Sequence, residues 1–230
     1  MMNESPKTSK EVQTIMRESM KKTERLTLSI HASHELENDP KHMLFRLSRY
    51  KFVAKMLRGR GRVLEIGCGD GMGAALVATE GNQILGVDIE PLAFENAIKT
   101  RWTRESMTFL EHDFVSGPIT GHSKLDAAYS LDVIEHLDPE NECVFVENIC
   151  SSLKETAPLI IGTPNKDAAA YQSPQSALQH INLHDQTSLQ RLLERYFENV
   201  FMFGMNDEVL HTGYSAMCHY IFGLAVQRRI

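Results

Sequence analysis

The chain has few of the features that define several common protein classes. Its 230 residues include only 4 cysteines and 1 tryptophan, and no two cysteines form a C-x-x-C pair. A thiolate zinc site or a redox pair is therefore not indicated. No run approaches the roughly 18 consecutive apolar residues that a membrane span needs. The start of the chain is polar where a signal peptide has an apolar stretch, so we expect a cytoplasmic protein with reduced thiols.

Positive charge is also scarce. The chain has 24 Lys and Arg against 30 Asp and Glu, which gives a formal net charge of −6. Because nucleic acids and anionic membranes are bound by clustered Lys and Arg, this balance argues against a broad nucleic-acid surface. A hydrophobic content of 42% and a charged content of 23% are typical of a globular protein. The length suits one domain with a modest extension.

The first organisational boundary falls near residue 59. Before it, the spacing of Thr8 and Glu11 predicts a capping box at the start of a helix, and a second helical pattern ends at Gly59. We therefore predict an N-terminal helical extension or lid over residues 1–58 and the main domain over residues 59–230. The first helix would carry an apolar stripe that consists of Val12, Ile15, Met16 and Met20.

From residue 62 onward, short apolar runs alternate with helical stretches. This alternation predicts an α/β fold with a mostly parallel sheet that is covered on both faces, and the last two runs, which have no helix between them, predict a closing antiparallel hairpin. The seven strand candidates are Val63–Ile66, Gln83–Val87, Met107–Leu110, Leu125–Tyr129, Pro158–Ile161, Val200–Phe203 and Met217–Val226, and the helix candidates are Ala74–Thr79, Ala93–Lys99, Glu140–Lys154 and Ser188–Tyr196.

A glycine-rich loop is the strongest local signal. It follows the first strand candidate and precedes a helix, which is the arrangement that lets a backbone approach a nucleotide at a helix N-terminus. The dinucleotide pattern G-x-G-x-x-G fails from Gly67, although Gly69-x-Gly71-x-x-Ala74 satisfies its looser form. More informative are Glu65, two residues before the first glycine, and Asp88, which closes the second strand candidate.

This combination of Glu65, the three glycines Gly67, Gly69 and Gly71, and Asp88 resembles the class I S-adenosylmethionine-dependent methyltransferases. The resemblance covers residues 62 to about 226. It implies a Rossmann-like, doubly wound, seven-stranded sheet and S-adenosylmethionine as cofactor. A nicotinamide enzyme is the alternative reading of the glycine loop.

The resemblance also assigns expected roles around the cofactor. The acid after the second strand, Asp88, would hold the ribose, and the acid after the third strand, Asp113, would contact the adenine. An arginine of the N-terminal segment, Arg49 or else Arg46, would contact the methionine carboxylate. An isolated acid at a strand end can also cap a turn, so the assignment depends on the joint spacing. The expected cofactor-binding set is Glu65, Gly67, Gly69, Gly71, Asp88, Ile89, Asp113, Phe114, Arg49 and Ser130.

Two acids and a histidine follow the fourth strand candidate. If a helical turn begins there, Asp132 and Glu135 share one face and His136 is adjacent, an arrangement that could bind a divalent cation. The segment is similar to the E-x-x-E-H cluster of the ubiquinone-biosynthesis O-methyltransferases and the small-RNA 3′-end 2′-O-methyltransferases, but Asp132 stands where those groups have Glu. A later histidine, His180, would complete the ligand set of Asp132, Glu135, His136 and His180.

Three roles for this cluster stay open at this point. The cluster could hold a metal, with Glu135, His136 and His180 acting in catalysis, or His136, His180 or His184 could act as a general base without metal. It could also be structural. We expect O-methylation of a hydroxylated small molecule, with RNA 2′-O-methylation, N-methylation and a silent cofactor-binding module as alternatives. The sequence indicates neither the acceptor nor the oligomeric state.

Overall fold

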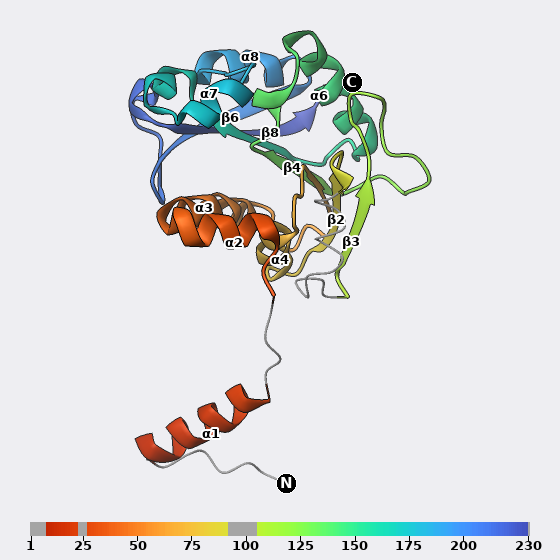
Figure 1. Ribbon diagram of the computed structural model, residues 1–230. Helices are drawn as coiled ribbons and strands as arrows, with labels where there is room; N and C mark the ends of the chain where they lie inside the picture. Colours follow the sequence, from red (N-terminus) through yellow and green to blue (C-terminus); the bar gives the residue numbers. More distant parts are fainter. Residues whose placement is uncertain (1–7, 23–26, 92–104, 230) are drawn as a thin grey trace.

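A single mixed sheet forms the centre of the protein. The computed structural model describes residues 8–22, 27–91 and 105–229. Within them, strands pair in the order β3-β2-β1-β4-β5-β8-β6-β7 (Figure 1). The strands are β1 (Arg62–Ile66), β2 (Gln83–Asp88), β3 (Met107–Glu111), β4 (Ala127–Leu131), β5 (Leu159–Pro164), β6 (Phe197–Asn206), β7 (Val209–His211) and β8 (Tyr220–Arg228).

The direction of the strands follows the predicted pattern. Strands β1 to β5 pair in parallel, and β8 pairs antiparallel with both β5 and β6. The α/β class, the mostly parallel sheet and the antiparallel closing pair are therefore confirmed. The predicted number of seven strands is wrong by one, because β7 pairs antiparallel with β6 at the sheet edge and makes eight. With three residues, β7 is too short to show an alternating pattern.

Helices and short 3₁₀ turns connect the strands. The predicted helices at Ala74–Thr79, Glu140–Lys154 and Ser188–Tyr196 correspond to α4, α6 and α8, whereas Ala93–Lys99 lies outside the described residues. The described elements are α1 (Ser9–Lys21), α2 (Ile30–Asn38), α3 (Pro40–Met56), α4 (Met72–Ala78), η1 (Ile134–His136), η2 (Pro139–Asn141), α6 (Glu142–Ser152), η3 (Lys166–Tyr171), α7 (Pro174–Gln179), α8 (Gln186–Glu194) and η4 (Ser215–Met217).

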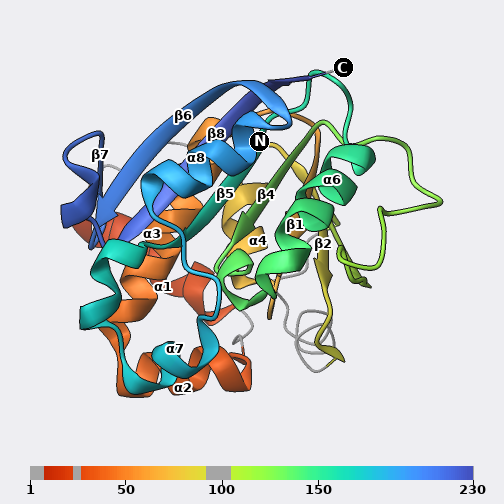
Figure 2. The same ribbon diagram turned by 90° about the horizontal axis from the view of Figure 1, so that it is seen from above.

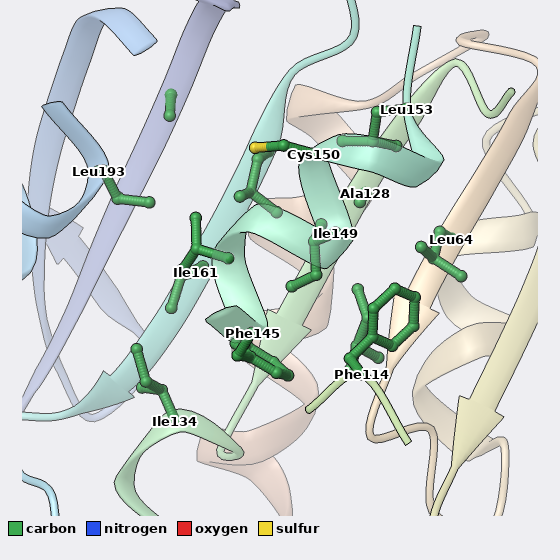
Figure 3. Close-up of a cluster of buried hydrophobic side chains, with 14 of the residues drawn as sticks. Leu64, Phe114, Ala128, Ile134, Phe145, Ile149, Cys150, Leu153, Ile161 and Leu193 are labelled. Atoms are coloured by element: carbon green, nitrogen blue, oxygen red, sulfur yellow. The ribbon is translucent and has the colours of Figure 1, made fainter. Parts of the chain in front are cut away.

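The sheet is covered on both faces because its buried strands are apolar on both sides. On β1, Leu64 belongs to the hydrophobic cluster formed with α6 and α8, whereas its neighbour Val63 belongs to the cluster formed with α3 and α4. Figure 3 shows the first cluster, in which Phe145 and Ile149 of α6 face Leu64 and the neighbouring strands. The fold is therefore a doubly wound α/β sheet, as predicted.

The N-terminal helices differ in how they join this core. Val53 and Leu57 are fully buried in the hydrophobic cluster that α3 and α4 form with one face of the sheet. Helix α3 therefore belongs to the helical layer on that face, although it precedes the predicted boundary at residue 59. By contrast, α1 has the predicted capping box of Thr8 and Glu11 but buries none of its residues, and it stands apart from the sheet in Figure 1. Among the described residues, no helix is both long and apolar enough to cross a membrane.

Candidate functional site

A cavity of about 650 Å³ opens at the carboxyl ends of the parallel strands. Figure 2 views the sheet from above and shows β1, β2 and β4 side by side, as their pairing requires. Ligands of doubly wound folds bind at this end, where the strand order reverses on either side of β1. The wall is formed by residues at the ends of four strands, by η1 and by one residue each of α6 and α7, and includes Gly67, Gly69, Asp88, Ile89, His112, Asp113, Phe114, Asp132, Val133, His136, Leu137, Phe145 and Gln179.

The glycine loop forms the floor of this cavity for steric reasons. Gly67 has φ of +77°, and a Cβ there would lie 2.2 Å from Cγ2 of Val133. Gly69 has φ of +52°, and a Cβ there would meet no atom within 4 Å. Both conformations favour glycine, and the space next to Gly69 is open to a ligand. Gly71, with φ of +76°, is the N-cap residue of α4 and does not line the cavity.

The carboxylate of Asp88 joins the glycine loop to the end of β2. One oxygen accepts a hydrogen bond from the backbone N–H of Gly69 at 2.8 Å, and the other accepts from the N–H of Glu90 at 2.9 Å. Next to it, Ile89 is 66% exposed and lines the cavity. Asp88 therefore holds the loop in shape while its carboxylate borders the open space.

The segment after β3 forms the opposite wall. Phe114 is buried and packs edge-on against both His112 and Phe145. Asp113 borders the cavity, but its oxygens accept hydrogen bonds from the N–H of Val115 at 2.8 Å and from the hydroxyl of Ser116 at 2.5 Å. The hydroxyl of Ser116 is the largest influence that lowers the pKa of Asp113. Asp113 thus caps a turn and lines the cavity at the same time.

Glu65 is the most deeply buried acid near the loop. It is 1% exposed, and neither of its carboxylate oxygens has a hydrogen-bond partner among the described residues. Burial raises its pKa to about 8; the hydroxyls of Tyr129 and Tyr50 oppose this shift, although neither meets the geometry of a hydrogen bond to it. A buried acid with unpartnered oxygens, directly before the cavity-lining Ile66 and Gly67, is a typical feature of a ligand site.

Two further predicted residues lie behind the wall. Ser130 is buried, and its hydroxyl donates to the carbonyl of Ile66 at 3.3 Å. Arg49 of α3 donates from Nη1 to both oxygens of Asp132, at 2.8 and 2.9 Å. Its alternative, Arg46, instead pairs with Glu35 at 2.6 Å. Of the two arginines, only Arg49 therefore contacts a residue that lines the cavity.

Three of the predicted acceptor-side residues meet at the edge of the cavity. One potential ligand atom from each of Glu135, His136 and His180 lies within 4.8 Å of the other two. The histidine rings are 5.1 Å apart in an edge-on arrangement. Glu135 is fully buried, and burial, followed by the charge of Asp132, raises its pKa. Burial, followed by His136, lowers the pKa of His180, which favours the neutral imidazole.

The surroundings orient these three side chains. Oε2 of Glu135 accepts from the hydroxyl of Thr163 at 3.0 Å, whereas its Oε1 has no described partner. Nδ1 of His136 lies 3.1 Å from the carbonyl of Gln179, and Nδ1 of His180 lies 3.2 Å from Oε1 of Gln172. Hydrogen bonds at Nδ1 leave Nε2 of each ring as the free ligand or base.

The structure does not bring every predicted residue to this cluster. Asp132 precedes the 3₁₀ turn, with φ of +57°, so it does not share a helical face with Glu135, and its carboxylate contacts Arg49. His184 lies elsewhere too, with Nε2 3.1 Å from Oε2 of Glu142, and burial lowers its pKa. The condition that a helical turn begins at Asp132 is therefore not met, because the 3₁₀ turn begins at Ile134.

Sequence reasoning also missed part of the wall. His112 is next to the predicted Asp113, so its position after β3 was a usable signal. Leu137 and Phe145 read as ordinary core residues, and Gln179 at the end of α7 belongs to no motif. The contribution of Gln179 depends on the path of a long connection, which no local pattern reveals.

These features fit a cofactor of the expected kind. The open space at Gly69, the unpartnered carboxylate of Glu65 and the apolar surface of Phe114 match a positively charged nucleoside with an aromatic base. The unpartnered Oε1 of Glu135 and two free imidazole nitrogens likewise match a divalent cation. Fold and cavity together define a nucleotide-binding α/β protein with a charged cluster at the cavity edge.

Comparison with known proteins identifies the family of this chain. A family model described as a methyltransferase domain matches residues 34–200, and the chain belongs to this family. A probable S-adenosylmethionine-dependent methyltransferase of Mycobacterium tuberculosis is 31% identical over 104 residues, which are 45% of this chain and 36% of that protein. The ubiquinone biosynthesis O-methyltransferase of Rickettsia felis is 26% identical over 132 residues, which are 54% of this chain and 48% of that enzyme.

Solved structures agree with this fold. The methyltransferase domain of bacterial CtHen1 has a TM-score of 0.62 at 21% identity, covering 79% of this chain and 98% of that domain. The plantazolicin methyltransferase in complex with S-adenosylhomocysteine has a TM-score of 0.62 at 17% identity, covering 86% and 89%. The predicted class of enzyme and its S-adenosylmethionine cofactor are confirmed for this domain, while the matches span less than half of the curated relatives above.

Proposed function

We propose that the chain transfers a methyl group from S-adenosylmethionine to an oxygen of a hydroxylated small molecule, with a divalent cation assisting. The observation that supports this is the Glu135, His136 and His180 cluster, which borders the cofactor cavity through His136. Acids and imidazoles at the acceptor side suit a hydroxyl acceptor, because an alcohol must lose its proton to become a good nucleophile.

On the cofactor side, the chain would bind S-adenosylmethionine and orient it. Bound S-adenosylmethionine supplies an electrophilic methyl group on a sulfonium. The backbone of Gly67 and Gly69 lets the cofactor approach the loop, with Gly71 starting the helix behind it, and Asp88 would accept from the ribose hydroxyls. Phe114 and Ile89 offer apolar contacts to the adenine beside Asp113. Glu65, Ser130 and Arg49 form the buried layer behind the loop, where the carboxyl of Glu65 would ionise and balance the sulfonium charge only once the cofactor is bound.

On the acceptor side, the chain would bind the cation and take up the proton that the acceptor hydroxyl loses. Two imidazoles and one carboxylate suit Mn²⁺, Fe²⁺, Co²⁺ or Zn²⁺ better than Mg²⁺, which prefers oxygen ligands. Held by Glu135, His136 and His180, such an ion would supply Lewis acidity that lowers the pKa of an acceptor hydroxyl. Thr163 and the partners at Nδ1 of both rings keep the ligands in place. Leu137 and Phe145 exclude water from the nearby wall.

A metal-free route is the second candidate, supported by the pKa of His180. Because that pKa is lowered, His180 is neutral at pH 7 and can accept a proton from the acceptor. The same base would serve N-methylation. RNA 2′-O-methylation is favoured by the resemblance of the acid-histidine segment to the small-RNA group and by the fold shared with the small RNA methyltransferase HEN1, and the net charge of −6 opposes it.

We also propose that the chain divides near residue 59. In this proposal, the N-terminal extension of residues 1–58 contributes to the choice of acceptor.

Turnover tests the proposal directly. The purified protein is incubated with isotopically labelled S-adenosylmethionine and fractionated pools of metabolites or RNA, and mass spectrometry identifies any labelled product. We expect a labelled small molecule with an O-methyl group. Chelator should abolish this labelling, and Mn²⁺, Co²⁺ or Zn²⁺ should restore it. Labelling that ignores chelator supports the histidine base instead, and cofactor binding without any labelled product supports the silent module.

A further inference from the structure

A buried ion pair connects the N-terminal segment to the end of β4. Nη1 of Arg49 donates to both oxygens of Asp132, at 2.8 and 2.9 Å, and the guanidinium carbon of Arg49 lies 3.9 Å from the centre of the Tyr220 ring. The Arg49 side chain is 11% exposed. A charge this buried requires a partner, and Asp132 supplies it with both of its oxygens.

The backbone of Asp132 is shaped for this contact. Its φ of +57° lies in the left-handed region, which costs free energy for a residue other than glycine. Its N–H donates to the carbonyl of Gly162 on β5 at 3.0 Å, so the neighbouring strand holds the residue in place. A strained residue that is hydrogen-bonded on both backbone and side chain has a defined position, and that position is in the cavity wall.

The same geometry keeps the carboxylate of Asp132 out of the acceptor-side cluster, although Asp132 is near enough for its charge to raise the pKa of Glu135. Glu135, His136 and His180 meet without it, and its carboxylate is already occupied by Arg49. Asp132 instead lines the cavity together with its neighbour Val133, whose Cγ2 packs against Gly67 of the glycine loop.

We propose that Asp132 is a positioning residue for the cofactor side: it fixes Arg49 and closes the cavity wall, and it is not a ligand of the cation. Only one part of this inference rests on the proposed function, namely the statement that Asp132 does not bind the cation. Its core claim, that the Arg49–Asp132 pair acts as one unit in cofactor binding, can be tested without metal and without an acceptor.

The first experiment measures S-adenosylhomocysteine affinity by calorimetry and bound metal by elemental mass spectrometry on the full chain. Asp132→Asn should weaken S-adenosylhomocysteine binding at least tenfold and leave the metal content unchanged. Asp132→Glu, which keeps the charge, should recover part of the affinity. Loss of metal from Asp132→Asn, with affinity within twofold of the wild type, would overturn the proposal.

A double-mutant cycle keeps the test decisive if one variant folds poorly. Arg49→Met and Asp132→Asn are measured singly and together, with unfolding temperature as a check on folding. If the pair acts as a unit, the double variant binds S-adenosylhomocysteine no more weakly than Arg49→Met alone and unfolds at a higher temperature than either single variant. If the fold-losses of affinity of the two single variants simply multiply in the double variant, Arg49 and Asp132 do not act as a unit. A wild type that holds no cation would refute the proposed metal role but leave this cycle as the test of Asp132.

Discussion

The cofactor cavity and the acceptor-side cluster are built in different ways. The cavity takes Gly67, Gly69, Asp88 and Asp113 from the last residue of a parallel strand or from the segment that follows one, so strand pairing alone brings them together. The cluster combines Glu135 and His136 of η1 with His180, which arrives through a long connection containing η3 and α7. A site at strand ends is therefore positioned by the sheet, whereas the cluster depends on how one connection packs.

Because of this difference, damage on the cofactor side should abolish ligand binding, whereas damage at the cluster should spare it.

Gly69→Val should remove measurable S-adenosylhomocysteine binding, because its side chain would project into the open space of the cavity. Calorimetry measures the binding. Gly81→Val is a matched control, since Gly81 also has positive φ, at +85°, and open space around it, but lies outside the cavity. Similar binding losses in both variants would mean that backbone strain, and not the cavity, is responsible.

Glu135→Gln should lower turnover about 100-fold or more while S-adenosylhomocysteine affinity stays within about twofold, because the residue faces the acceptor and not the cofactor. Bound metal should fall in parallel. Steady-state kinetics on the labelled product provide the measurement, and Glu140→Gln, an exposed glutamate in η2, is the control. An equal loss of cofactor affinity would show that the two regions are not separable.

Asp88→Ala should weaken S-adenosylhomocysteine binding by about 1–3 kcal/mol, the usual cost of losing a charged hydrogen-bond partner. This corresponds to about a 5- to 150-fold higher Kd. The loss has two sources, the ribose contact and the bond from the Gly69 N–H that shapes the loop. Titration calorimetry with Asp88→Asn alongside separates them, since Asn keeps an acceptor but no charge. Unchanged affinity in both variants would remove Asp88 from the site.

Glu65 should make the stability of the ligand-free protein fall as pH rises. Its folded pKa, about 8, is above the ordinary value of 4.5, so between these values the folded protein binds more protons than the unfolded chain. The free energy of unfolding therefore decreases across this window, by up to about 1.4 kcal/mol per pH unit. Denaturant unfolding of Glu65→Gln at several pH values should show a flatter dependence than the wild type. Parallel curves would mean that Glu65 ionises normally.

Much of the fold follows from local patterns. Glycines at positive φ, acids at strand ends and apolar runs are properties of short segments, and parallel strands bring the segments that follow them to one edge of the sheet. For this reason the sequence alone predicted the glycine loop, the place of Asp88 and a mostly parallel sheet covered on both faces, whereas the methyltransferase class came from the resemblance of these motifs to a known family. It did not reveal the three-residue strand β7, because a pattern that short cannot be told from a turn.

Only the tertiary structure decided how the charged residues combine. In the sequence, Asp132, Glu135 and His136 form one run, yet Asp132 contacts Arg49 of α3 while the other two face His180. The left-handed backbone at Asp132 turns its side chain away from the face that a helix would give it. Likewise Arg46 and Arg49 are equivalent as sequence, and the packing of α2 against α3 assigns Arg46 to Glu35. Partner choice among charges depends on distances between segments remote in the chain, and those distances are set by the packing of the whole fold.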